Sequence, residues 1–173
     1  MKQVLSKDGT TIAFDQSGQG PALILVGGAF QYRAIDPPTA QLAALLAEQF
    51  TVCHYDRRGR GDSSDTQPYE VEREVEDLEA LINEAGGSAF VFGMSSGGAL
   101  ALDAAARGLA ITKLALYEVP FNSGDERARA AEATAPPENG RPAGSEHTTV
   151  NTIVPRGIKD ARPRCYFLSD RLI

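Results

Sequence analysis

The chain has 173 residues, of which 42% are hydrophobic and 23% charged, a composition that fits one globular domain with a substantial core. Its net charge of −6 argues against nucleic acid as a partner, because phosphate binding needs a basic surface. The two cysteines lie outside any CxxC pattern, and no apolar leader or membrane-length apolar stretch is present. These features predict a cytoplasmic protein without a membrane partner.

Residues 1–121 alternate strand-like and helix-like patterns. Lys7-Asp8-Gly9 separates two β-like runs, 2–6 and 11–16, and Asp-Gly in that position predicts a hairpin. Apolar residues recur at the helical period of about 3.6 residues over 70–85, the clearest helix. Further strands are expected at 22–26, 50–55, 89–92 and 111–117, and further helices at 39–48 and 96–106. This order predicts an α/β fold, a doubly wound and mostly parallel sheet with helices on both faces.

The composition changes near residue 121. Residues 122–149 contain no Val, Ile, Leu, Met, Phe, Tyr, Trp or Cys, so they can bury little apolar surface and are expected to be disordered. Short apolar groups return at 150–154 and 166–168, too few for a second core. We therefore divide the chain into a core, 1–121, and an atypical tail, 122–173.

The run Gly93-Met94-Ser95-Ser96-Gly97 fits the pattern G-x-S-x-G between a predicted strand and a predicted helix. A sharp turn there would push the central side chain above the sheet and leave room only for small neighbours. Ser95 is the candidate nucleophile, and the Ser96 N–H at the helix N-terminus is the first candidate oxyanion donor. The alternative is that Ser95 or Ser96 only caps the helix.

A second small-residue stretch, Val26-Gly27-Gly28-Ala29-Phe30, follows the buried strand at 22–26. In a sheet of this kind, the loop after the third strand supplies a second backbone donor to an oxyanion. Ala29 is the favoured donor, followed by Phe30. The alternative is an ordinary tight turn.

The stretch Tyr55-Asp56-Arg57-Arg58-Gly59-Arg60-Gly61-Asp62-Ser63 makes the pattern specific. Together with the glycine loop and GMSSGG, it resembles the α/β-hydrolase superfamily of the serine-nucleophile type, whose members carry a YDxRGxGxS-like stretch after the fourth strand. The resemblance covers about residues 1–121 and departs from many relatives at Gly27-Gly28, where they read His-Gly. We expect the arginines to form structural ion pairs with the interleaved Asp56 and Asp62, rather than a phosphate-binding patch.

The resemblance implies a histidine base and an acid, in the chain order Ser, acid, His. His147 is the only histidine after Ser95, and it lies in the tail. His54 is expected to pack within its strand. Three acidic residues are candidates for the acid: Glu118, Asp125 and Asp160. Glu118, just after the sixth strand, has the best placement, with a polar strand end as the alternative.

The resemblance further implies a serine hydrolase that acts on a small ester or related acyl substrate and needs no cofactor or metal. Serine at the centre of the turn Gly93–Gly97, which we call the elbow, disfavours dehalogenase- or epoxide-hydrolase-type chemistry, which starts from a carboxylate. The alternative is a non-catalytic binding module or a frameshifted or truncated remnant, because the tail replaces the strands expected after the sixth. Without those strands, 111–117 would form an exposed sheet edge, and we expect self-association through it.

Overall fold

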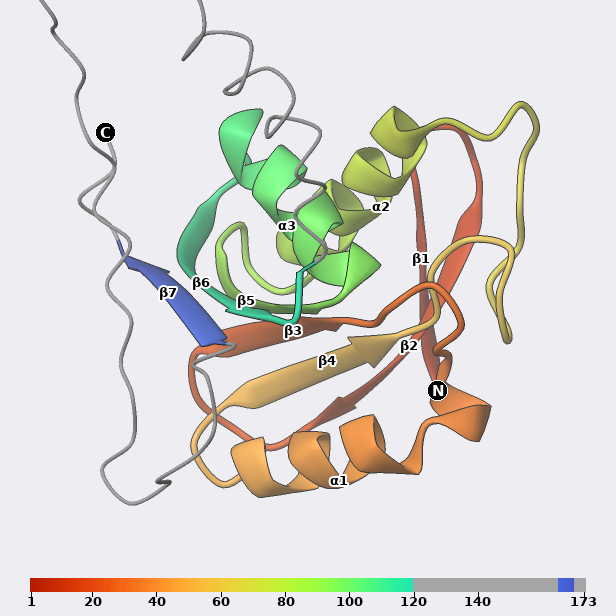
Figure 1. The fold of residues 1–173 in the computed structure, drawn as a ribbon. Coiled ribbons are helices and arrows are strands. Elements are labelled where there is room, and N and C mark those ends of the chain that lie inside the picture. Colours follow the sequence, from red (N-terminus) through yellow and green to blue (C-terminus); the bar gives the residue numbers. More distant parts are fainter. Residues whose placement is uncertain (120–164, 170–173) are drawn as a thin grey trace, which may run out of the picture.

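A central sheet organises the computed structural model, which describes residues 1–119 and the course of a strand at 165–169 (Figure 1). Seven strands lie in the order β1-β2-β4-β3-β5-β6-β7. Their bounds are β1 Lys2–Leu5, β2 Thr11–Ser17, β3 Ala22–Val26, β4 Thr51–Tyr55, β5 Ala89–Met94, β6 Ile111–Tyr117 and β7 Cys165–Ser169. The helices are α1 Pro37–Leu46, α2 Val71–Glu84 and α3 Ser96–Ala106, with a short 3-10 helix, η1, at Arg33–Ile35.

The directions of the strands confirm the predicted fold class. Strands β4, β3, β5 and β6 run parallel to one another in the middle of the sheet. The predicted hairpin of β1 and β2 joins them through an antiparallel pairing of β2 with β4. Gly9 turns the hairpin at φ 84, a conformation that favours glycine.

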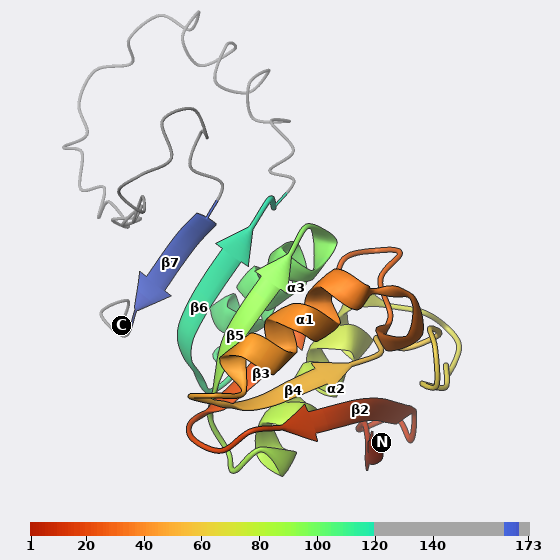
Figure 2. The same ribbon diagram turned by 90° about the horizontal axis from the view of Figure 1, so that it is seen from below.

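Helices cover both faces of the sheet, α1 on one face and α2 and α3 on the other (Figures 1 and 2). Strand β3 shows how the sequence produces these layers. Ile24 and Val26 belong to the apolar cluster that includes α2 and α3, whereas Leu23 and Leu25 pack in a second cluster with Ala43 of α1. Both faces of β3 are therefore buried, as its continuous apolar run predicts.

Two element boundaries differ from the expected ones for local reasons. Helix α1 begins at Pro37, earlier than expected, because Asp36 caps it by accepting the Thr39 N–H at 3.2 Å, and proline is favoured in the first turn. Strand β5 continues to Met94, because Gly93 and Met94 still pair with β6. The short helix η1 was not predicted. None of the helices in the described part of the chain has the length and apolarity to cross a membrane.

The tail contributes one strand, which the sequence did not predict. Strand β7 pairs antiparallel with β6, and Cys165 lies opposite Tyr117. The expectation that β6 forms an exposed edge is therefore wrong, because β7 occupies that edge. A short apolar run satisfies the unpaired backbone of β6 although it is too short to signal a strand by itself. The remaining predictions for the tail, including the disorder of 122–149, lie outside the described residues.

Candidate active site

Ser95 occupies a strained turn between β5 and α3. Its φ of 52° and ψ of −123° lie outside the regions that non-glycine residues favour. The Ser95 N–H donates to the Tyr117 carbonyl of β6 at 2.9 Å, which ties the turn to the neighbouring strand. The Ser95 side chain makes no capping hydrogen bond, although the residue stands at the N-cap position of α3. Helix capping therefore does not explain this serine.

Two glycines around Ser95 are required by close backbone packing. A Cβ on Gly93 would lie 2.6 Å from the Gly98 Cα, inside any acceptable contact. A Cβ on Gly97 would overlap the carbonyl oxygens of Val26 and Gly27 at the end of β3. Small residues therefore allow α3 to start directly against β3 and β5, and this packing positions the elbow.

The loop after β3 lies next to the elbow. A Cβ on Gly28 would be 3.5 Å from the Ser95 Cβ, so the two backbones are in close proximity. The Gly28 N–H donates to the Gln31 side-chain oxygen at 2.6 Å. Neither the Ala29 N–H nor the Ser96 N–H donates a hydrogen bond within the described residues. In the part of the chain that the structure describes, the two candidate oxyanion donors are therefore amides without a hydrogen-bond partner, on the two segments that meet at Ser95.

The buried side chain of Arg57 connects the loop after β3 and the start of α3 to helix α2. Its guanidinium donates to the Gly27 carbonyl at 3.2 Å and to the Ser96 Oγ at 3.0 Å. The same group forms a bidentate pair with Glu74 at 2.5 and 2.7 Å. Burial acts to raise the pKa of the Glu74 carboxyl, but the hydrogen bonds and charge of Arg57, together with a hydrogen bond from Tyr69 and the charge of Arg60, outweigh it and leave the pKa below its usual range. This ion pair fixes both the β3 loop and the first residue of α3.

Arg57 and Arg58 form structural ion pairs, but with partners other than those expected, whereas Arg60 forms no ion pair within the described residues. Arg57 binds Glu74, and Arg58 binds Asp77 at 2.6 and 2.8 Å, so both reach α2. The interleaved Asp56 and Asp62 instead bind one residue, Arg33 of η1.

Charged residues on the apolar face of α2 could have indicated these partners. Glu74 and Asp77 are almost fully buried and stand beside the core residues Val75 and Leu78. Carboxylates in such positions are normally paired. No local signal points to Arg33, since it contacts Asp56 from 23 residues away.

The candidate acid lies at the same edge of the sheet as Ser95. Glu118 directly follows β6, whose last residue, Tyr117, accepts the Ser95 N–H. Its φ of 51° makes it, with Ser95, one of two described non-glycine residues with positive φ. The other two acid candidates, Asp125 and Asp160, lie outside the described residues.

The histidines do not complete the site within the described residues. His147, the candidate base, lies outside them. His54 is buried in β4, where burial lowers its pKa, and it forms no hydrogen bond with Ser95. The described part of the chain also holds no group of three or more side chains that could bind a metal.

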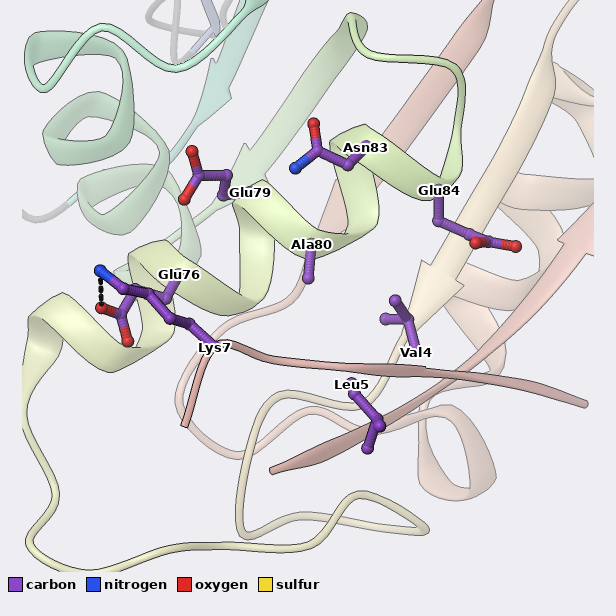
Figure 3. A pocket seen from close by; sticks show the side chains of 8 residues that line it. All are labelled: Val4, Leu5, Lys7, Glu76, Glu79, Ala80, Asn83 and Glu84. Carbon is purple, nitrogen blue, oxygen red and sulfur yellow. Dashed lines mark ion pairs between the residues drawn. The ribbon is translucent and has the colours of Figure 1, made fainter. Parts of the chain in front are cut away.

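The structure also contains a groove that none of the candidate site residues lines (Figure 3). It has a volume of about 560 Å³ and lies between β1 and α2. Lys7 spans its edge and pairs with Glu76 at 3.2 Å. Its lining residues are Val4, Leu5, Lys7, Glu76, Glu79, Ala80, Asn83 and Glu84. None of them is a candidate nucleophile, base or oxyanion donor.

Comparisons with known proteins give a consistent result. The model of the alpha/beta hydrolase family matches residues 22–170. An alpha/beta hydrolase from Sphaerobacter thermophilus DSM 20745 is 54% identical with a TM-score of 0.66, and the match covers 76% of this chain and 54% of that chain. An alpha/beta hydrolase from Novosphingobium aromaticivorans DSM 12444 is 29% identical with a TM-score of 0.59, covering 75% and 48%.

An esterase from Rhodococcus sp. ECU1013 is 25% identical to the chain with a TM-score of 0.62, covering 68% of this chain and 45% of that chain. The chain thus spans about half the length of these similar structures.

Proposed function

Because the chain belongs to the alpha/beta hydrolase family, we propose that it is a serine hydrolase that acts on a small ester or related acyl substrate. The observation that carries this proposal is the backbone of Ser95. Conformations of this kind cost on the order of 1–3 kcal/mol and cluster at functional sites. Here the strained residue carries an uncapped hydroxyl, and the Ala29 and Ser96 amides on the two neighbouring segments have no hydrogen-bond partner among the described residues.

The proposed reaction begins when the Ser95 Oγ attacks the acyl carbon and its proton passes to a histidine. The carbonyl electron pair moves onto oxygen, and the Ala29 and Ser96 N–H groups stabilise that oxyanion at the N-terminus of α3. The bond to the leaving alcohol then breaks, and the alcohol takes up the proton. Water repeats the sequence on the acyl-enzyme and regenerates Ser95.

His147 is the proposed base and Glu118 the proposed acid. The register of β6 and β7 supports this assignment, since Tyr117 and Cys165 pair at the end of the sheet where Ser95 lies. In the sequence, these two residues flank the segment that contains His147. A non-catalytic binding module is not favoured, because the similar structures include an esterase and several hydrolases.

The direct test is covalent labelling with a fluorophosphonate probe, which requires an activated serine. We expect the wild-type chain to be labelled, Ser95→Ala to lose labelling, and Ser96→Ala to retain it because its backbone N–H remains. His147→Ala should lower both labelling and the hydrolysis of p-nitrophenyl acetate. Equal labelling of wild type and Ser95→Ala would refute the assignment of the nucleophile.

A further inference from the structure

Gln31 holds the loop that carries the candidate oxyanion donor Ala29. Its side-chain oxygen accepts the Gly28 N–H at 2.6 Å, and its backbone N–H donates to the Gly28 carbonyl at 3.3 Å. One residue thus binds both polar groups of Gly28. The two partners of the side-chain amide fix its orientation. The Gly28 N–H requires the amide oxygen as acceptor, and the carboxylate of Asp36 requires the amide nitrogen as donor.

The other end of the Gln31 amide is anchored to α1. Its nitrogen donates to Asp36 Oδ2 at 2.7 Å. Asp36 is itself buried and fixed, since it accepts the Thr39 N–H at 3.2 Å and the Thr39 hydroxyl at 2.6 Å. A chain of hydrogen bonds therefore runs from the N-terminus of α1 to the backbone of Gly28.

This arrangement decides which amide of the loop is available to a substrate. Gly28 is close to Ser95, with 3.5 Å between a Cβ placed on it and the Ser95 Cβ, yet its N–H is occupied by Gln31. The Ala29 N–H that follows has no partner in the described part of the chain. Without Gln31, the Gly27-Gly28 pair could rotate through conformations that other residues avoid.

We propose that Gln31 is a positioning residue of the oxyanion site: it occupies the Gly28 amide and so directs the Ala29 amide toward the acyl oxygen. This inference rests on the proposed serine hydrolase function. Its effect is exerted through backbone geometry, so it should appear in the rate of the chemical step more than in substrate affinity. A misplacement of about 1 Å costs on the order of 10²-fold in rate.

The test compares two substitutions that separate rate from stability. Gln31→Met keeps the length of the side chain but removes its two side-chain hydrogen bonds, one with the Gly28 N–H and one with Asp36. It should slow fluorophosphonate labelling on the order of 10²-fold. Gln31→Glu keeps an oxygen for the Gly28 N–H but places a carboxylate beside Asp36. It should therefore melt at a lower temperature than wild type yet label within a few-fold of the wild-type rate. Gln67→Met, which removes an exposed glutamine bound to Asp65, is the matched control and should change neither quantity.

Labelling rates are measured well below each melting temperature, together with kcat and KM for p-nitrophenyl acetate. Equal rates for Gln31→Met and Gln67→Met would overturn the inference. So would a loss of rate in both Gln31 variants that follows their loss of stability. A wild-type chain that is not labelled would overturn the proposed function itself. Proton exchange of the Gly28 amide, followed by NMR, tests the clamp without any activity: exchange equally fast in wild type and Gln31→Met would refute it.

Discussion

Replacing Arg58 by methionine should strongly destabilise the fold, because it leaves a buried carboxylate without its partner. The side chains of Arg58 and Asp77 are each 1% exposed and joined by hydrogen bonds of 2.6 and 2.8 Å. Arg58 also binds Asp8 at 2.9 Å. Removing one member of a buried pair costs about 3–5 kcal/mol. At about 2–4 °C per kcal/mol for a chain of this size, the melting temperature should fall by roughly 6–20 °C.

The assay is thermal and urea unfolding of Arg58→Met beside Arg107→Met. Arg107 is the matched control, because its pairs with Asp103 and Glu72 are exposed and worth about 0–1 kcal/mol. KM should change little in Arg58→Met at temperatures where the variant is folded. An unchanged melting temperature together with a large rise in KM would mean that Arg58 contacts substrate, and the reasoning would be wrong.

The loss of stability caused by Arg58→Met should depend on pH in a defined direction. Burial raises the pKa of Asp77 even though Arg58 opposes it, and in the variant this opposing effect of Arg58 is lost. A folded-state pKa above the unfolded value of about 3.9 means that the folded variant takes up a proton first as the pH falls. The destabilisation of Arg58→Met relative to wild type should therefore be smaller at pH 5 than at pH 8. A deficit that grows toward pH 5 would contradict this mechanism.

Three further perturbations address the site and the core. Gly97→Ala should destabilise the fold by about 1–3 kcal/mol or more and slow labelling of Ser95, because the added Cβ would overlap two backbone carbonyl oxygens. A urea midpoint equal to that of the wild type would contradict this. Glu74→Gln should lower stability and labelling together, since it leaves the Arg57 guanidinium buried without a counter-charge; labelling at the wild-type rate would show that Arg57 does not support the site. Cys53 should resist iodoacetamide at pH 8 until the protein unfolds, because burial raises its pKa to about 12; peptide mapping that finds rapid modification under native conditions would refute this.

Local features of this fold could be predicted from the sequence, and long-range contacts could not. The glycines around Ser95 were informative because the crowding that requires them arises within one tight turn. The partners of Arg57 and Arg58 were missed because their side chains point toward α2 and not along their own loop. Strand β7 forms where β6 offers an unpaired edge, so its short apolar run gains meaning only from its neighbour.

The role of Gln31 was equally hidden from the sequence. A glutamine three residues after a glycine has no distinctive pattern, and its function depends on Asp36 being held at the start of α1. The catalytic assignments remain predictions for a similar reason, since a serine, an acid and a histidine become a triad only through their distances.

The position of Arg57 has a consequence for how this protein loses its structure. One guanidinium joins the end of β3, the start of α3 and the face of α2. Segments that share such a group open as a cooperative unit, so partial unfolding of α2 would release the elbow and the glycine loop with it. Hydrogen exchange in α2 and inactivation of Ser95 should then follow the same opening equilibrium. A helix that takes no part in the proposed chemistry would in this way set the lifetime of the active conformation.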